Sequence, residues 1–126
     1  MIDIDNFKQI NDIYGHDTGD KVLEQVGIIL QRSFRKADFV SRIGGDEFAA
    51  LIDIENKEQL ANTVHRIEEN IAGFIIHSSY PFSLHLSIGY DLWTFSSAST
   101  QEQFFRHIGQ KMYQAKQNKK PIFREI

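Results

Sequence analysis

A pair of adjacent glycines between two strand-like runs constrains the fold of this chain more than any other feature. Gly44 and Gly45 divide the stretch from Asp38 to Asp53 into two short segments. Glycine accepts the positive φ that a tight turn between antiparallel strands requires. The stretch therefore predicts a β-hairpin.

Four segments carry apolar residues at the spacing of an α-helix. Gly15 is expected to end the first of these helices, and Thr18 or Asp20 to cap the second. The four predicted helices run over residues 7–14, 22–34, 60–74 and 104–115.

Three further segments are predicted as strands. Met1–Asp5 is apolar and short, residues 82–90 alternate between apolar and polar, and Pro121–Ile126 forms a short last strand. Ser96–Thr100 is a polar loop, and no repeat or linker divides the chain, so residues 1–126 are expected to form one domain. This order of elements indicates an α/β fold of the α+β type, with helices packed on a mixed sheet of about five strands.

Composition narrows the classes of protein that the chain can belong to. With 14 basic and 17 acidic side chains the net charge is −3, which gives no electrostatic case for binding nucleic acid or a membrane surface. There are no cysteines, so thiol catalysis and Cys-ligated zinc are excluded. No apolar run approaches the roughly 20 residues that span a bilayer, and no signal peptide is evident. We expect a cytoplasmic domain, which a membrane-bound sensor protein could carry on its inner side.

Two acidic clusters suggest a metal site. Asp3 and Asp5 lie at the end of the first predicted strand, and Asp46 and Glu47 follow the glycine pair. If the hairpin lies beside the first strand, Asp3 and Asp46 face each other, and two like charges about 4 Å apart repel by roughly 4 kcal/mol at an effective dielectric near 20. Such a site needs a cation or a proton. Hard oxygen ligands suit Mg²⁺ (or Mn²⁺) bound together with a phosphate substrate.

Glycines and lysines supply groups that bind phosphate. The N–H groups of Gly44 and Gly45 can approach a phosphate closely because no Cβ intervenes. Lys8 follows the first acidic cluster, and Lys116 and Lys120 share one face of the last helix. Carboxylates for metal and lysines for phosphate together indicate a nucleotidyl-transfer site.

Asn11 and Asp20 can read a guanine base. A carboxylate accepts from the N1–H and N2 amino groups of guanine, and an amide donates to O6 or N7. Adenine mismatches both, which would cost about 1–3 kcal/mol for the partner left unpaired. Each of these features alone also has a purely structural explanation: such residues often cap helices, and lysines at a helix end often complement the helix dipole.

In combination, the motifs resemble the GGDEF family of diguanylate cyclase domains. The match runs from one end of the chain to the other, in five ordered segments. They are Gly44-Gly45-Asp46-Glu47-Phe48 after Arg42, the D-x-D-x-F-K-x-I-N-D run from Asp3 to Asp12, G-H-x-x-G-D from Gly15 to Asp20, the Ser87-Ile88-Gly89 strand, and M-Y-x-A-K from Met112 to Lys116.

The resemblance implies a fold and a metal-dependent reaction. The fold is a palm-like sheet similar to that of adenylyl cyclases and some polymerases, with the Gly-Gly-Asp-Glu-Phe motif on a β-hairpin. Two GTP molecules would be condensed into cyclic di-GMP and two pyrophosphates. Two Mg²⁺ ions would be held by Asp3, the backbone carbonyl of Ile4, Asp46 and Glu47, and Glu47 would alternatively help to activate the 3′-hydroxyl.

The resemblance also implies the remaining substrate contacts and the partners. Each domain would bind one GTP, and two domains would face each other as a dimer under the control of upstream sensory or regulatory domains. An R-x-x-D site at Arg35 and Asp38 would bind the product and inhibit the enzyme. The substrate contacts would come from Phe7, Lys8, Asn11, Asp20, Gly44, Gly45, Lys116 and Lys120.

The chain departs from the family pattern in two places. The family has a helix and a D-x-L-T-G-L-x-N-R segment before its first strand, whereas this chain begins inside that strand. Gly109, Lys111 and the Lys119-Lys120-Pro121 run replace other residues near the phosphate-binding end. A catalytically inactive module that binds GTP or cyclic di-GMP is therefore the alternative to an active cyclase.

Overall fold

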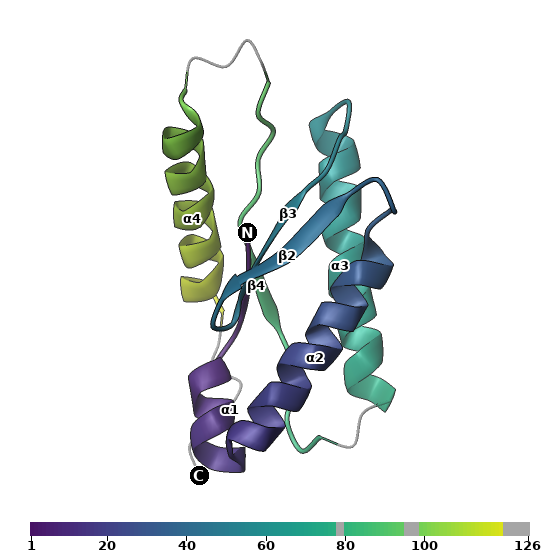
Figure 1. Cartoon of the computed structure of the whole chain (residues 1–126), viewed down its shortest axis with the longest axis vertical. Coiled ribbons are helices and arrows are strands. Elements are labelled where there is room, and N and C mark those ends of the chain that lie inside the picture. The colour runs from purple at the N-terminus through teal and green to yellow at the C-terminus, as the bar shows by residue number, and fades with distance from the viewer. Residues whose placement is uncertain (78–79, 95–98, 120–126) are drawn as a thin grey trace.

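The computed structural model describes residues 1–77, 80–94 and 99–119. Four strands and four helices follow one another in that part of the chain (Figure 1). In chain order they are β1 (Ile2–Ile4), α1 (Phe7–Tyr14), α2 (His16–Ser33), β2 (Phe39–Gly44), β3 (Glu47–Leu51), α3 (Lys57–His77), β4 (Leu86–Ile88) and α4 (Gln101–Gln117). The α/β fold class and the hairpin are confirmed. The predicted fifth strand at 121–126 lies outside the described residues.

The four strands form one sheet in the order β2-β3-β1-β4, and every described neighbouring pair is antiparallel. The first strand, β1, lies between β3 and β4. Asp3 is paired with Glu47 on one side and with Ser87 on the other. This central position brings residues from the beginning, the middle and the end of the chain to one strand.

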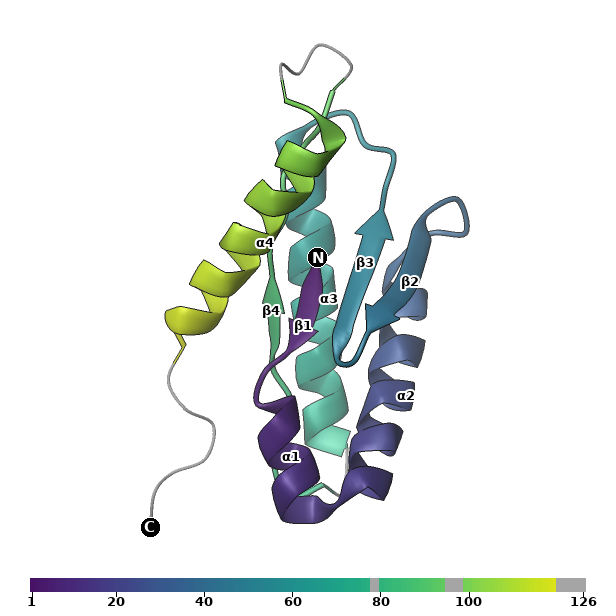
Figure 2. The same ribbon diagram turned by 60° about the vertical axis from the view of Figure 1, so that its left-hand side comes forward.

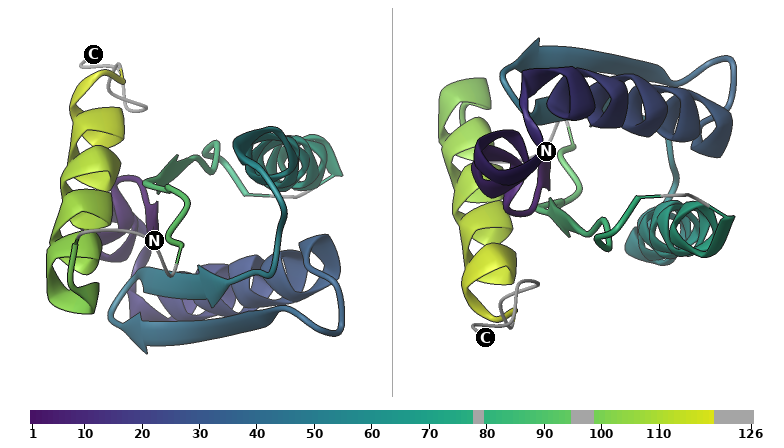
Figure 3. Two further views of the ribbon diagram at one scale, coloured as in Figure 1. Left: turned by 90° about the horizontal axis from the view of Figure 1, so that it is seen from above. Right: turned by 90° about the horizontal axis from the view of Figure 1, so that it is seen from below.

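The alternating sequence Ile2-Asp3-Ile4-Asp5 explains how the sheet faces its two layers of helices. Successive side chains of a strand point to opposite faces. Ile2 and Ile4 belong to the hydrophobic core. The carboxylates of Asp3 and Asp5 accept hydrogen bonds from two lysines, Lys116 in the last turn of α4 and Lys119 just after it. Seen along the long axis of the molecule, α4 lies on one side of the sheet and the α2–α3 pair on the other (Figure 3).

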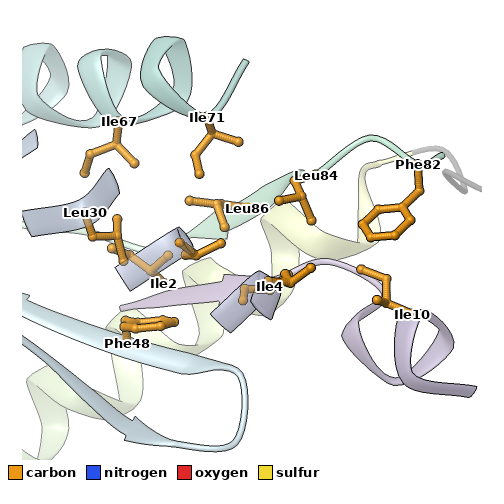
Figure 4. Close-up of a cluster of buried hydrophobic side chains, with 12 residues drawn as sticks. Ile2, Ile4, Ile10, Leu30, Phe48, Ile67, Ile71, Phe82, Leu84 and Leu86 are labelled. Carbon is orange, nitrogen blue, oxygen red and sulfur yellow. The ribbon is translucent and has the colours of Figure 1, made fainter. Parts of the chain in front are cut away.

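The core lies between the sheet and the α2–α3 pair (Figure 4). Leu30 of α2 and Ile67 and Ile71 of α3 point toward Leu86 and Phe48 of the sheet (Figure 4). Full burial of one such side chain contributes about 1.5–3 kcal/mol. The apolar residues whose helical spacing predicted α2 and α3 are thus the residues that these helices bury in the core.

The last helix begins and packs for identifiable reasons. Thr100 accepts from the backbone of Gln103 at 3.1 Å, and the side chain of Gln103 accepts from the backbone of Thr100 at 3.0 Å, which is a capping box. Ile108 and Met112 are the buried residues of this helix. A Cβ on Gly89 would lie 2.9 Å from Cα of Met112 and would overlap backbone atoms of Ile108 and Met112. Glycine at this position therefore lets α4 contact the sheet backbone directly.

Some boundaries differ from the predictions. Helix α2 begins at His16, directly after Gly15 (φ 92°), so neither Thr18 nor Asp20 caps it; the hydroxyl of Thr18 instead donates to the carbonyl of Tyr14 at 3.0 Å. Only residues 86–88 of the predicted strand 82–90 pair with β1, although Phe82 and Leu84 are buried as the alternation predicted. Helices α3 and α4 are each longer than predicted. No helix among the described residues is long and apolar enough to cross a membrane.

Candidate active site

The end of β1 lies beside the tip of the hairpin (Figure 2), which brings Asp3 of the first predicted acidic cluster next to Asp46 and Glu47 of the second. Asp3 lies directly opposite Glu47 in the β1–β3 pair. The next residue, Ile4, donates its N–H to the carbonyl of Asp46 at 3.2 Å. Side chains of directly opposed residues lie on the same face, with Cβ atoms about 4.5–5.5 Å apart, and like charges there destabilise the sheet. The expectation that Asp3 and the hairpin tip face each other is confirmed.

The carboxylate of Asp3 is buried and only half satisfied. Its Oδ2 accepts from Lys116 Nζ at 2.7 Å, whereas its Oδ1 is buried with no hydrogen-bond partner in the described part of the chain. The pKa of Asp3 is raised to about 6: burial is the largest cause, the neighbouring carboxyl of Asp46 also raises it, and Lys116 opposes both. A buried acceptor beside a second carboxyl is a place where a cation would relieve an electrostatic cost.

Among the described residues, the ammonium group of Lys116 is the positive charge bonded to Asp3. Burial alone would lower the pKa of Lys116, but its hydrogen bond to Asp3 and the charges of Asp3, Asp46 and Asp5 outweigh burial and raise that pKa. The side chain is 42% exposed, so it retains access to a ligand from the solvent side. The structure thus brings together the lysine predicted to bind phosphate and the aspartate predicted to bind metal.

Asp5 has a different environment from Asp3, although the sequence placed both in one cluster. Its Oδ1 accepts from the hydroxyl of Ser87 at 2.5 Å and its Oδ2 from Lys119 Nζ at 2.8 Å. Lys119 also donates to the carbonyl of Leu86, so it joins the segment after α4 to the edge strand. The carboxylate of Asp5 is fully occupied within the protein. Sequence reasoning missed the roles of Ser87 and Lys119; the alternation of β1 together with the Ser87-Ile88-Gly89 motif could have indicated them.

The donor set fits a hard divalent cation. Asp3 offers a free buried oxygen next to Asp46, and the N–H of Ile4 bonds the carbonyl of Asp46, so the backbone of Ile4 adjoins the hairpin tip. Within residues 1–77, 80–94 and 99–119, no group of three or more Asp, Glu, His or Cys side chains is arranged to hold a metal ion. The oxygen chemistry of Asp3 and Asp46 fits a hard cation, whereas the complete set of Asp3, Ile4, Asp46 and Glu47 stays a prediction.

The hairpin turn places Asp46 at the tip. Gly44 ends β2 and pairs with Glu47, so the two turn residues are Gly45 and Asp46. Gly45 has φ 50°, which a residue with a side chain rarely adopts. Gly44 and Gly45, predicted to approach a phosphate, are both exposed, and a Cβ added to either would meet no atom of the described residues within 4 Å.

The predicted base-reading residues lie where α1 meets α2. Helix α1 begins at Phe7, two residues after Asp5. Asn11 of α1 is half-buried, and its Oδ1 is buried with no partner among the described residues. Asp20 of α2 and Lys8 of α1 are exposed, and Phe7 packs against the core. Within the described part of the chain, the side chains of Asn11, Asp20 and Lys8 have no hydrogen bond or ion pair that would compete with a ligand. Lys120, predicted to bind phosphate, lies outside the described residues.

Arg35 and Asp38, the two residues of the R-x-x-D motif, form an ion pair with each other, and their role in binding the product stays a prediction. Asp38 accepts from the backbone N–H of Arg35 at 2.9 Å, and Nε of Arg35 lies 3.5 Å from the same carboxylate oxygen. The guanidinium also donates to the carbonyl of Asp53 at 2.9 Å, while its side chain remains 63% exposed. The pair joins the end of α2 to the segment after β3, and the arginine is presented to solvent.

Comparisons with known proteins agree with this geometry. The family model described as the diguanylate cyclase, GGDEF domain matches residues 1–121. The chain is 36% identical over 117 residues to diguanylate cyclase DgcP of Pseudomonas aeruginosa, covering 92% of this chain and 17% of that protein. It is 32% identical over 131 residues to the probable diguanylate cyclase DgcT of Escherichia coli, covering 100% of this chain and 29% of that protein. The chain thus spans less than a third of the length of these two relatives.

Solved structures give the same assignment. The GGDEF domain of PA1120 (YfiN or TpbB) from Pseudomonas aeruginosa superposes with a TM-score of 0.79 at 30% identity, covering 94% of this chain and 74% of that one. The GGDEF domain of DgcB from Caulobacter crescentus, solved in complex with c-di-GMP, gives a TM-score of 0.80 at 25% identity, covering 92% and 69%. Sheet order, hairpin motif, family match and structural similarity agree: this chain belongs to the GGDEF family of diguanylate cyclase domains.

Proposed function

We propose that this domain is the catalytic part of a diguanylate cyclase, which condenses two GTP molecules into cyclic di-GMP. The observation that carries the proposal is the half-satisfied carboxylate of Asp3, whose free Oδ1 lies in a site shared with Asp46 while Lys116 binds its other oxygen. A structural ion pair alone does not need a second carboxyl beside a buried, unpaired oxygen. A site for a cation and a triphosphate does.

The reaction consists of two equivalent nucleotidyl transfers. The 3′-hydroxyl of each GTP attacks the α-phosphorus of the other, a P–O bond forms, and the bond to the bridging oxygen breaks to release pyrophosphate. Magnesium held by Asp3, the Ile4 carbonyl, Asp46 and Glu47 would lower the pKa of the hydroxyl and neutralise charge on the phosphates. Manganese could substitute, because it accepts the same oxygen ligands. Glu47, which pairs with Asp3 in the sheet, would accept the proton of the hydroxyl or complete the set for a second ion.

The remaining residues bind and orient GTP. Lys116 would exchange its contact with Asp3 for the outer phosphates, a role shared with Lys8 and Lys120. The open turn backbone of Gly44 and Gly45 would approach the phosphates on the other side. Asn11 and Asp20 would read the guanine, with Phe7 packed beneath them.

The reaction requires two domains. One site holds one GTP, so a second GTP must be presented by a second copy of the domain. Upstream sensory or regulatory domains would control that encounter; this chain spans less than a third of the two relatives, which leaves room for such domains. GTP is available in the cytoplasm, where we place the domain.

Product assays test the proposal. Concentrated protein is incubated with GTP and Mg²⁺, and the nucleotides are separated by chromatography. We expect cyclic di-GMP from the parent chain and from Glu24→Ala, which removes an exposed acid of α2, but none from Asp46→Ala. Equal product from the Asp46 and Glu24 variants would overturn the assigned site, and consumption of GTP without cyclic di-GMP would overturn the assigned reaction.

A second candidate function is regulation by binding cyclic di-GMP without turnover. The exposed guanidinium of Arg35, held by the buried carboxylate of Asp38, favours it, because arginine binds guanine or phosphate in a bidentate manner. In an active cyclase the same pair would mediate product inhibition. Cyclic di-GMP should bind the parent and Arg106→Ala, which removes an equally exposed arginine of α4, and should not bind Arg35→Ala. Binding that survives Arg35→Ala would remove both roles from this site.

A further inference from the structure

Two local features that are each unfavourable meet where α1 lies against α2. Gly19 lies in the second turn of α2 and is buried, and it has an ordinary helical φ. Glycine destabilises a helix interior relative to alanine, so the backbone conformation gives no reason for it here. The second feature is Oδ1 of Asn11, which is buried without a hydrogen-bond partner among the described residues.

The two features have one cause in the packing. A Cβ on Gly19 would overlap Oδ1 of Asn11, would lie 2.8 Å from its Cγ, and would be 3.3 Å from Cζ of Phe7. The carbonyl end of the Asn11 amide therefore occupies the volume that a side chain at position 19 would need. The contrast with Gly27 in the same helix is clear, because an added Cβ there would meet only Cε1 of Phe48, at 4.0 Å.

We infer that Gly19 is a positioning residue for base recognition: its missing side chain lets α2 hold the Oδ1 end of Asn11 and so fixes the direction of the other end of the amide. This inference rests on the proposed function of Asn11 as a reader of guanine. With Oδ1 held against α2, the Nδ2 end is the one left to donate to the base. Asp20, the second proposed base reader, follows Gly19 directly, so the same helix turn positions both groups.

Steric conflict predicts what a side chain at this position does. In Gly19→Ala the methyl group displaces the amide of Asn11, because the atoms that it meets belong to the side chain at the recognition site rather than to open space. Recognition of the base is lost while the phosphate-binding groups on the hairpin and α4 are untouched. Gly27→Ala, with the same change in the same helix, leaves Asn11 in place.

Equilibrium binding separates these effects. The probes are guanosine and adenosine α,β-methylene triphosphates, which cannot transfer a nucleotidyl group, and inorganic tripolyphosphate, which carries no base. We expect Gly19→Ala to weaken binding of the guanosine probe at least tenfold and to reduce its preference over the adenosine probe by a similar factor. Affinity for tripolyphosphate should stay within twofold of the parent, and Gly27→Ala should match the parent with all three probes. Equal guanosine affinity and preference in the two alanine variants would overturn the inference.

Thermal unfolding covers the case in which Gly19→Ala folds poorly. The double variant Asn11→Ala/Gly19→Ala removes the side chain that the new methyl group meets, so it should recover most of the lost melting temperature. Failure of Asn11→Ala to relieve the destabilisation would also overturn the inference. A parent chain that shows no guanosine preference counts against the proposed function instead, so the two failures are distinguishable.

Discussion

Lys116 Nζ donates to Asp3 Oδ2 at 2.7 Å, and this bond joins residues 113 positions apart across the face of the sheet that α4 covers. It makes the last helix part of the site at the end of β1. Two acidic residues of different segments and one lysine therefore form a single electrostatic unit before any ligand is bound.

Replacing Lys116 tests that unit. Lys116→Met leaves the buried carboxylate of Asp3 beside Asp46 with no counterion, so the protein should be destabilised in the absence of metal. We expect a loss of about 1 kcal/mol, the range of a pair whose lysine is partly exposed to screening solvent. Urea unfolding with and without Mg²⁺ measures it, and Mg²⁺ should stabilise the variant more than the parent. Lys21→Met, at an exposed position of α2, is the control; equal responses to Mg²⁺ in all three proteins would contradict the unit.

The contact between α4 and the sheet backbone depends on Gly89. A methyl group there would overlap backbone atoms of Ile108 and Met112, which cannot rotate away. Gly89→Ala should therefore cost about 3 kcal/mol or more, the upper range for overpacking, and should also reduce the proposed cyclase activity by moving Lys116 away from Asp3. Gly109→Ala on α4 meets no atom within 4 Å and should be neutral or slightly stabilising. Chemical unfolding measures the change in stability of each variant. Similar stability for Gly89→Ala and Gly109→Ala would refute the packing argument.

Asp91 should make stability depend on pH in the acid range. Its carboxylate accepts from His107 at 2.9 Å and lies 3.2 Å from Lys111 and 3.3 Å from Lys57. These contacts join the segment after β4 to the start of α3 and to the middle of α4. The hydrogen bond from His107, followed by the backbone N–H of Leu92 and the two lysines, holds the pKa of Asp91 below its ordinary value of 3.8 against the effect of burial. A depressed pKa in the folded state means that the stabilisation is complete above that ordinary value and is lost as the pH falls through the folded pKa.

Asp91→Asn is the matched variant for this prediction. It should lower the free energy of unfolding by about 1 kcal/mol at pH 7, because three of the partners are partly exposed, and it should flatten the fall of stability below about pH 4. Urea unfolding between pH 2.5 and 7 measures both effects. An unchanged acid profile in the variant would show that Asp91 does not contribute.

Much of this site could be predicted from the sequence because its residues belong to short, ordered motifs. The hairpin around Gly45 and Asp46 and the opposition of Asp3 to the hairpin tip are confirmed. The alternation Ile2-Asp3-Ile4-Asp5 carries the division between a core face and a site face, which follows from the period of a strand.

The remaining features depend on contacts that local patterns do not contain. The carboxylate of Asp5 differs from that of Asp3 because both of its oxygens accept hydrogen bonds from Ser87 and Lys119, which lie more than 80 residues away along the chain. The start of α2 was predicted too late because Gly15 is both the C-cap of α1 and the N-cap that precedes α2. The hydroxyl of Thr18 therefore lies inside α2 and donates to the carbonyl of Tyr14 instead of capping the helix. The short β4 reflects pairing with a short β1, which only the sheet order reveals.

The dependence of cyclic di-GMP formation on protein concentration tests the central claim most directly. Initial rates are measured at saturating GTP and Mg²⁺ over a wide range of protein concentration, with Asp46→Ala in parallel. If two domains each present one GTP at the site of Asp3 and Asp46, the rate per domain rises with protein concentration until the dimer is fully formed, and Asp46→Ala gives no product at any concentration. A rate per domain that is constant down to the lowest dilution, or product from Asp46→Ala, would contradict the account.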